Sequence, residues 1–81
     1  MAKEVKIYTT PTCVYCKMTK AFFEKNHIQY QELNVAVDAK AREEMVHTSG
    51  QLGVPVITVD HEVVIGYDPE ELSRLLGIKQ E

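Results

Sequence analysis

The sequence predicts one α/β domain in which three helices cover both faces of a four-stranded mixed sheet, in the order β-α-β-α-β-β-α. Two alternating apolar segments near the N-terminus are separated by a segment of helical length, which a parallel pair of strands requires. Two short β-branched segments near the C-terminus are separated by only a few residues, as in a β-hairpin. A chain of 81 residues can bury one modest core, so a single domain over residues 1–81 is expected.

The first unit is predicted to be a strand, a helix and a second strand. Residues 3–9 alternate, with Val5 and Ile7 on one face and Tyr8 on the other, and a Thr-Pro-Thr turn ends the strand. Residues 28–35 alternate more loosely and predict the second strand, reached by a right-handed crossover. The apolar residues that recur at helical spacing between the strands, and predict a helix from residue 14 to about 26, are Val14, Met18, Ala21 and Phe22.

A second helix is predicted between Asp38 and Gly50. Asp38 is suited to cap the helix N-terminus, and Ser49-Gly50 places glycine in its usual position after the last turn. Met45 in this helix and Met18 in the first helix each lie on an apolar face. Both methionines are therefore expected to fill the core.

The C-terminal part is predicted to be a hairpin followed by a third helix. Residues 55–59 and 63–65 are the two short strands of the hairpin, joined through residues 60–62. Asp68 is the predicted N-cap of the last helix, and Gly77 follows its apolar residues. The start of this helix is further supported by Pro69 and Glu71.

The composition, 44% hydrophobic and 26% charged, is that of an ordinary globular protein. A net charge of -3 and the absence of any lysine or arginine cluster argue against nucleic acid as a partner. No apolar stretch approaches the ~20 residues of a membrane span, and the N-terminal residues enter a strand pattern directly. We therefore expect a cytoplasmic monomer that does not associate with membranes.

The only two cysteines, Cys13 and Cys16, lie where the first strand gives way to the first helix. Side chains three apart on a helix face one another at roughly 5–6 Å between Cβ atoms, so a modest adjustment allows a disulfide. The positive end of the helix favours thiolate and can lower a cysteine pKa from ~8.5 to roughly 3.5–7.5. A single Cys-x-x-Cys in a reducing compartment therefore indicates redox chemistry.

The geometry assigns different roles to the two thiols. Cys13, at the tip of the helix, is the predicted nucleophile; Cys16, one turn in and partly beneath it, is the predicted resolving thiol. The alternatives are two structural thiols or a zinc site, and four ligands are the rule for zinc. The histidines show no zinc-ligand spacing among themselves or with the cysteines; they are His27, His47 and His61.

Three motifs follow one another along the chain: Pro11-Thr12-Cys13-Val14-Tyr15-Cys16 after the first strand, Gly53-Val54-Pro55, and Gly66-Tyr67-Asp68. In the order and spacing of these motifs, which span about nine tenths of the sequence, the chain resembles the glutaredoxin family of the thioredoxin-like fold. A proline at a strand start would by itself suggest an ordinary trans bond. The resemblance instead implies that Val54–Pro55 is cis and that the Val54 backbone pairs with an extended substrate segment.

The resemblance also implies a glutathione site. Glutaredoxins contact glutathione through an aromatic residue in the Cys-x-x-Cys loop, a glutamine or arginine before Val-Pro, and an acidic residue at the last helix start. These positions match Tyr15, Gln51 and Asp68, so Asp68 is expected both to cap the helix and to accept the glutathione amino group. The other residues of the predicted glutathione- or substrate-binding site are Thr12, Val54, Pro55, Gly66 and Tyr67.

Three positions depart from the family pattern. Thr10 replaces a common basic residue, Val14 a common proline, and Ile65-Gly66 the usual Gly-Gly. Loss of the cation near Cys13 weakens the prediction of tight glutathione binding. It leaves open a redoxin reduced by thioredoxin reductase that donates electrons to ribonucleotide reductase.

The sequence therefore predicts a dithiol oxidoreductase that reduces protein disulfides or glutathione mixed disulfides. The resemblance implies glutathione as co-substrate, no bound cofactor, and glutathione or thioredoxin reductase as the source of electrons. An alternative of a different class is an iron-sulfur or zinc module in which two chains each contribute Cys13.

Overall fold

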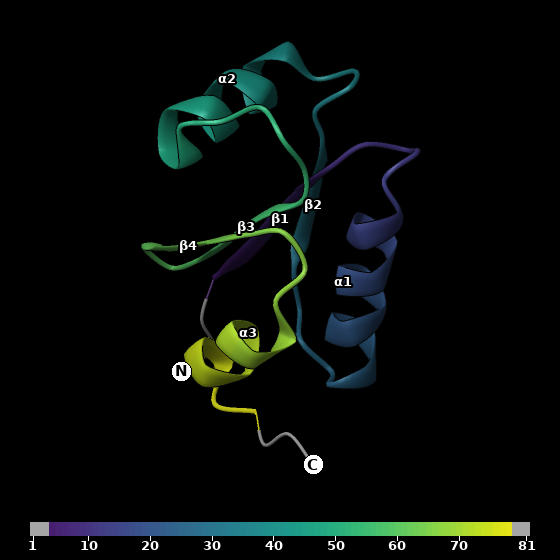
Figure 1. Ribbon diagram of the computed structural model, residues 1–81, viewed down its shortest axis with the longest axis vertical. Helices are drawn as coiled ribbons and strands as arrows, with labels where there is room; N and C mark the ends of the chain where they lie inside the picture. The colour runs from purple at the N-terminus through teal and green to yellow at the C-terminus, as the bar shows by residue number, and fades with distance from the viewer. Residues whose placement is uncertain (1–3, 79–81) are drawn as a thin grey trace.

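The computed structural model describes residues 4–78 and confirms the predicted order of elements (Figure 1). Lys3, expected in the first strand, lies outside the described residues. The sheet has the order β2-β1-β3-β4, with β1 parallel to β2 and the other two pairs antiparallel. The elements are β1 (Val5–Thr9), α1 (Val14–Lys25), β2 (Gln31–Asn34), α2 (Ala39–Ser49), β3 (Val56–Val59), β4 (Glu62–Ile65) and α3 (Pro69–Leu76).

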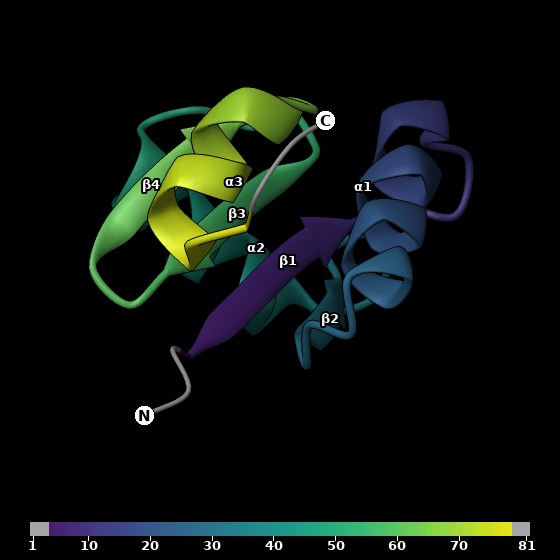
Figure 2. The same ribbon diagram turned by 90° about the horizontal axis from the view of Figure 1, so that it is seen from below.

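The sheet is covered on both faces, as predicted. Figure 2 shows α1 and α3 on one side of the sheet and α2 on the other. The alternation of β1 divides its side chains between the two layers, since Val5 and Ile7 pack with the α1 and α3 residues whereas Tyr8 packs with those of α2. A mixed sheet with both faces buried explains why β1 and β3 are so apolar.

Helix α1 buries a different face from the one expected. The sheet covers Cys16, Thr19 and Phe23, whereas Met18 remains 42% exposed and Val14 66% exposed. The buried residues are also spaced three and four apart, so the helix carries two alternative stripes, and the buried stripe contains the large ring of Phe23. The Thr19 hydroxyl can be buried because it donates to the backbone carbonyl of Tyr15 at 2.8 Å. The expectation that Met18 fills the core is therefore wrong, whereas Met45 is fully buried.

Strand β2 begins three residues later than predicted. Asn26 ends α1, and His27 adopts a left-handed conformation with φ 57°, so the chain turns before it can pair with β1. Ile28 then donates its N–H to the carbonyl of Phe23 at 2.8 Å. Ile28 and Tyr30 are half-buried against the α1 and α3 side of the core, which explains their apolar character outside a strand.

The predicted ends of α2 and α3 are confirmed. Asp38 accepts the backbone N–H of Ala41 at 3.0 Å, and Gly50 follows α2 with φ 76°. At α3, Asp68 is the N-cap and Gly77 follows the helix. The end of α2 and the start of α3 border two connecting segments, α2 to β3 and β4 to α3. These two segments contain most of the remaining candidate site residues.

Candidate active site

Cys13 and Cys16 form a disulfide at the start of α1, with their Cα atoms 5.2 Å apart. Cys13 is the N-cap residue, and its Sγ accepts the backbone N–H of Cys16 at 3.0 Å. Cys16 is only 1% exposed, whereas Cys13 is partly open to solvent. The predicted difference in access between the two sulfur atoms is therefore present in the structure.

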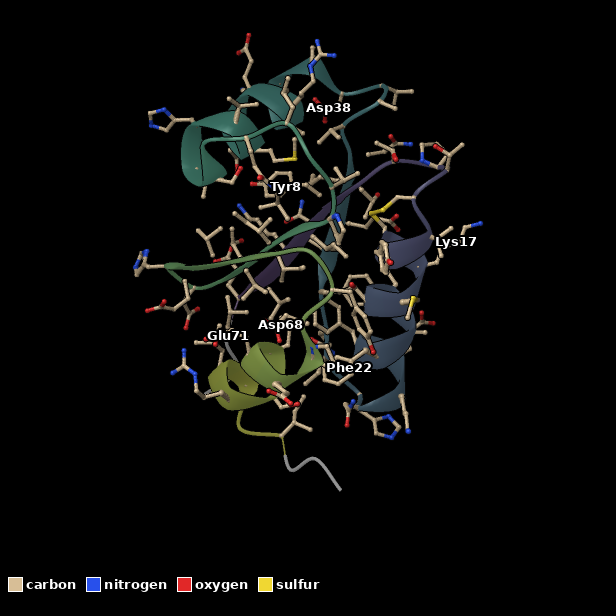
Figure 3. All side chains as sticks on the ribbon, viewed as in Figure 1. Tyr8, Lys17, Phe22, Asp38, Asp68 and Glu71 are labelled. Carbon is tan, nitrogen blue, oxygen red and sulfur yellow. A yellow bond between two sulfur atoms is a disulfide. The ribbon has the colours of Figure 1, made fainter. Side chains whose placement is uncertain are left out.

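The electrostatic surroundings of Cys13 favour a negative charge. An N-cap side chain lies beside the unpaired N–H groups of the first turn and the positive end of the helix dipole. The first turn of α1 contains no acidic residue that would cancel this effect. Lys17 follows one turn later and points outward into solvent (Figure 3). We expect these features to stabilise the thiolate form of Cys13 relative to the thiol in the reduced protein.

The Val54–Pro55 peptide bond is cis, as the resemblance implies. Pro55 is buried, and Val54 is half-buried against the α2 side of the core. The carbonyl of Pro55 accepts the backbone N–H of Gly66 at 2.9 Å. This hydrogen bond brings together two of the three motifs that the sequence singled out.

The segment from Gly66 to Asp68 leads from β4 into α3. Gly66 has φ 80°, a conformation that side chains other than glycine rarely adopt. The ring of Tyr67 meets the ring of Phe22 edge to face, with centroids 6.5 Å apart. Figure 3 places Phe22 on the part of α1 that faces α3 and Asp68 at the start of α3. Asp68 accepts the backbone N–H of Glu71 at 3.1 Å, which confirms its capping role.

The other predicted site residues lie nearer the surface. Thr12 is exposed in the turn before α1, and Tyr15 is 60% exposed on the first turn. Gln51 is half-buried, and its backbone bonds the Ser49 hydroxyl. Its side-chain amide lies over Gly53, 3.4 Å from the position that a Cβ would occupy. The hydrogen bonds described for Gln51 and Asp68 therefore stabilise local turns and do not join these residues to the cysteines.

The chain is similar in sequence to known proteins. A family model described as glutaredoxin matches residues 5–64. The chain belongs to the glutaredoxin family. It is 44% identical over 72 residues to an uncharacterized glutaredoxin-like 8.6 kDa protein of Clostridium pasteurianum, covering 89% of this chain and 96% of that protein. It is 41% identical over 64 residues to glutaredoxin 3 of Escherichia coli K12, covering 79% and 77% of the two chains.

Solved structures of the family share the fold. The glutaredoxin-like protein NrdH-redoxin of Escherichia coli superimposes with a TM-score of 0.78 at 28% identity, covering 89% of this chain and 93% of that chain. Glutaredoxins and NrdH-like proteins are thiol oxidoreductases, and this chain has the Cys13–Cys16 pair at the start of its first helix. Membership therefore assigns the chain to a class of redox proteins.

Sequence reasoning missed the contact between Phe22 and Tyr67. The two residues are far apart in the chain, and neither local pattern indicates that the other is its neighbour. One available signal was the pair Phe22-Phe23, because adjacent helical residues cannot both face the sheet. The second ring therefore required another partner, and Tyr67 supplies it.

Within residues 4–78, no group of three or more histidine, cysteine, aspartate or glutamate side chains could hold a metal ion. The alternative of an iron-sulfur or zinc module in which two chains each contribute Cys13 stays a prediction. None of the helices in the same residues is long and apolar enough to cross a membrane.

Proposed function

We propose that this glutaredoxin-family protein reduces disulfide bonds by a dithiol mechanism. The Cys13 thiolate attacks one sulfur of a substrate disulfide, forms a mixed disulfide and releases the first substrate thiolate. Cys16 then attacks the Cys13 sulfur, which releases the second substrate thiolate and leaves the Cys13–Cys16 disulfide. Two electrons pass to the substrate in each cycle, and an external reductant restores the dithiol.

The observation that supports this assignment is that the two sulfur atoms differ in position and in access to solvent. Cys13 caps α1 and is accessible, whereas Cys16 is buried beneath it but close enough to share the disulfide. Attack by a thiolate depends on ionisation and access, and Cys13 is favoured by both. Cys16 can act only after a mixed disulfide has brought a sulfur–sulfur bond within its reach.

Protein disulfides and glutathione mixed disulfides are the proposed substrates. Main-chain pairing of an extended substrate segment with the Val54 backbone, which membership of the family implies, suits a tripeptide and a protein strand equally. Glutathione is then a co-substrate with Tyr15, Gln51 and Asp68 among its contacts, and the domain needs no bound cofactor. This chemistry fits a reducing compartment such as the cytoplasm.

Substitution of each cysteine tests the mechanism. Cys13→Ser should abolish turnover, because the attacking sulfur is absent. Cys16→Ser should accumulate a mixed disulfide with the substrate that mass spectrometry detects, and it should retain activity only where a second thiol such as glutathione can resolve that species. Full activity of Cys13→Ser would contradict the assignment.

A second candidate within the same chemistry is a redoxin reduced by thioredoxin reductase that donates electrons to ribonucleotide reductase. Two observations favour it: Thr10 stands where many glutaredoxins have a cation, and the similar Escherichia coli NrdH-redoxin is described as having a thioredoxin-like activity profile. The test is turnover with two reductants in parallel, glutathione with glutathione reductase, and thioredoxin reductase with NADPH. Turnover with only the first supports a glutaredoxin, and turnover with only the second supports the redoxin.

A further inference from the structure

The segment Gly66–Asp68 makes contacts with three different parts of the molecule. The Gly66 N–H donates to the carbonyl of Pro55 at 2.9 Å, at the start of β3. The Tyr67 ring contacts Phe22 on α1, and Asp68 caps α3. The Tyr67 contact joins this segment directly to the helix that Cys13 caps and that contains Cys16.

Tyr67 is also the first member of a row of four aromatic rings. Its ring lies 6.5 Å from Phe22, which lies 6.1 Å from Phe23, and Phe23 lies 5.2 Å from Tyr30 just before β2. Phe23 is fully buried, whereas the rings at the two ends are half-buried. The row therefore has a site end, at Tyr67, and a distal end, at Tyr30.

We infer that Tyr67 is a positioning residue, and that its edge-to-face contact with Phe22 sets the place of Gly66–Asp68 beside α1 for substrate binding. This inference rests on the proposed function, in which that segment borders the bound substrate. Phe22 follows Cys16 by six residues, so it lies about 9 Å further along the helix axis. Because the Gly66–Pro55 hydrogen bond and the Asp68 cap still hold the ends of the segment, we expect loss of the contact to shift it locally without altering the N-terminal turn that holds Cys13.

The expected effect is on substrate binding and not on the thiol. An aromatic pair contributes about 0.5–1.5 kcal/mol beyond its buried area, so its loss can weaken substrate binding by up to roughly 2- to 13-fold. We therefore expect Tyr67→Ala to raise the KM by such a factor while kcat and the pH dependence of Cys13 alkylation stay as in the wild type. Tyr67→Phe keeps the ring and should restore the wild-type KM.

The experiment uses the full chain with two substrates, the mixed disulfide of glutathione and cysteine, and oxidised insulin. KM and kcat are measured on each substrate that the wild type turns over. Tyr30→Ala is the matched control, because it removes a half-buried ring from the other end of the same row. It should lower the stability and leave the KM unchanged. If Tyr67→Ala does not fold, Phe22→Leu removes the same contact while it keeps an apolar side chain, and it should raise the KM in the same way.

The outcomes separate the positioning role from general loosening and from failure of the proposed function. An unchanged KM in folded Tyr67→Ala, or an equal rise in Tyr30→Ala, would overturn the inference. A shifted pH dependence of Cys13 alkylation in Tyr67→Ala would also overturn it, because the effect would then reach the thiol. No turnover by the wild type with either substrate and either reductant would instead reject the proposed function, and with it the inference.

Discussion

The carboxylate of Asp68 accepts the backbone N–H of Glu71 at 3.1 Å, so the residue expected to bind the glutathione amino group already holds the start of α3. One carboxylate oxygen is engaged in the cap, and Asp68 as a whole is exposed. The capping role and the proposed binding role can be separated by substitution, because asparagine caps a helix about as well as aspartate but lacks the charge.

We expect Asp68→Asn to keep the wild-type stability within about 0.5 kcal/mol, whereas Asp68→Ala should lose about 1 kcal/mol because the Glu71 N–H loses its acceptor. If the charge binds the amino group of glutathione, Asp68→Asn should raise the KM for a glutathione mixed disulfide. Urea unfolding and steady-state kinetics on the two variants check both statements. A wild-type KM in Asp68→Asn would mean that Asp68 caps the helix but that its charge does not bind glutathione.

The reduced form of Cys13 should have a thiol pKa below the ordinary cysteine value of about 8.5. The cause is the hydrogen bond from the Cys16 N–H, together with the positive end of α1 and the lack of acidic residues in its first turn. The rate of alkylation of Cys13 as a function of pH, measured in Cys16→Ser, gives this pKa directly. A midpoint at the ordinary value would contradict the electrostatic account of the site.

Met18 and Met45 should respond very differently to truncation. Met45 is fully buried on the α2 side of the core, so Met45→Ala should cost about 2–5 kcal/mol of unfolding free energy. Met18 is 42% exposed, and Met18→Ala should lie within about 0.5 kcal/mol of the wild type. Chemical denaturation of the two variants makes the comparison, and a large loss in Met18→Ala would mean that this face of α1 is covered in solution.

The sequence could not decide which face of α1 is buried, because a helix with two apolar stripes satisfies the same periodicity twice. The stripe that contains Val14 and Met18 is the more apolar in sequence, but the sheet covers Cys16, Thr19 and Phe23. Thr19 can be buried in this stripe because its hydroxyl donates a hydrogen bond within the helix. The spacing of apolar residues alone does not predict that a polar residue will be buried. The helix ends were predictable because a capping residue forms its hydrogen bonds with residues only a few positions away in the chain.

The same distinction applies to the candidate site. Cys13 and Cys16 lie in one short segment, so their spacing and position at a helix start were sufficient to predict both the disulfide and the difference in access. The contact between Tyr67 and Phe22 depends on how α1 and the β4–α3 connection pack, which no local pattern encodes. The position of Gly66 beside Pro55 likewise required the register of β3 against β4.

Glu32 should contribute stability that is lost in acid. Its carboxylate accepts hydrogen bonds from Lys20 at 2.8 Å and from the Thr9 hydroxyl at 2.9 Å, and these lower its pKa, Lys20 most strongly. Because the folded pKa is lowered, the stabilisation is present above the ordinary value of 4.5 and disappears as the pH falls through the folded value. The group is partly exposed, so Glu32→Gln should lose less than about 1 kcal/mol at pH 7.

Urea unfolding of the wild type and Glu32→Gln across acidic pH tests this prediction. The difference between their unfolding free energies should shrink as the pH drops below 4.5. Glu43→Gln, at an exposed position on α2, is the control and should follow the wild type throughout. A difference between wild type and Glu32→Gln that does not depend on pH would show that the carboxylate charge contributes nothing to the network.

Tyr8 should affect stability in alkali. The residue is 1% exposed, and its hydroxyl donates a hydrogen bond to the Glu44 carboxylate at 2.8 Å. Burial is the main cause that raises the pKa of Tyr8 from 10.0 to about 12, and the hydrogen bond and charge of Glu44 add to it. A raised folded pKa means that the stabilisation is fully present below pH 10 and is lost as the pH rises towards 12. The loss is on the order of 2–3 kcal/mol, since each pKa unit corresponds to about 1.36 kcal/mol.

Tyr8→Phe removes the ionising hydroxyl while it keeps the buried ring. At pH 7 we expect it to be about 1 kcal/mol less stable than the wild type, because one hydrogen bond is lost. Above pH 10 the wild type should lose this advantage, so the two stability curves converge and then cross. Tyr15→Phe, on an exposed ring, is the control and should not change the alkaline slope. Stability curves for wild type and Tyr8→Phe that stay parallel from pH 9 to about 11.5 would mean that the Tyr8 hydroxyl ionises as it does in the unfolded chain.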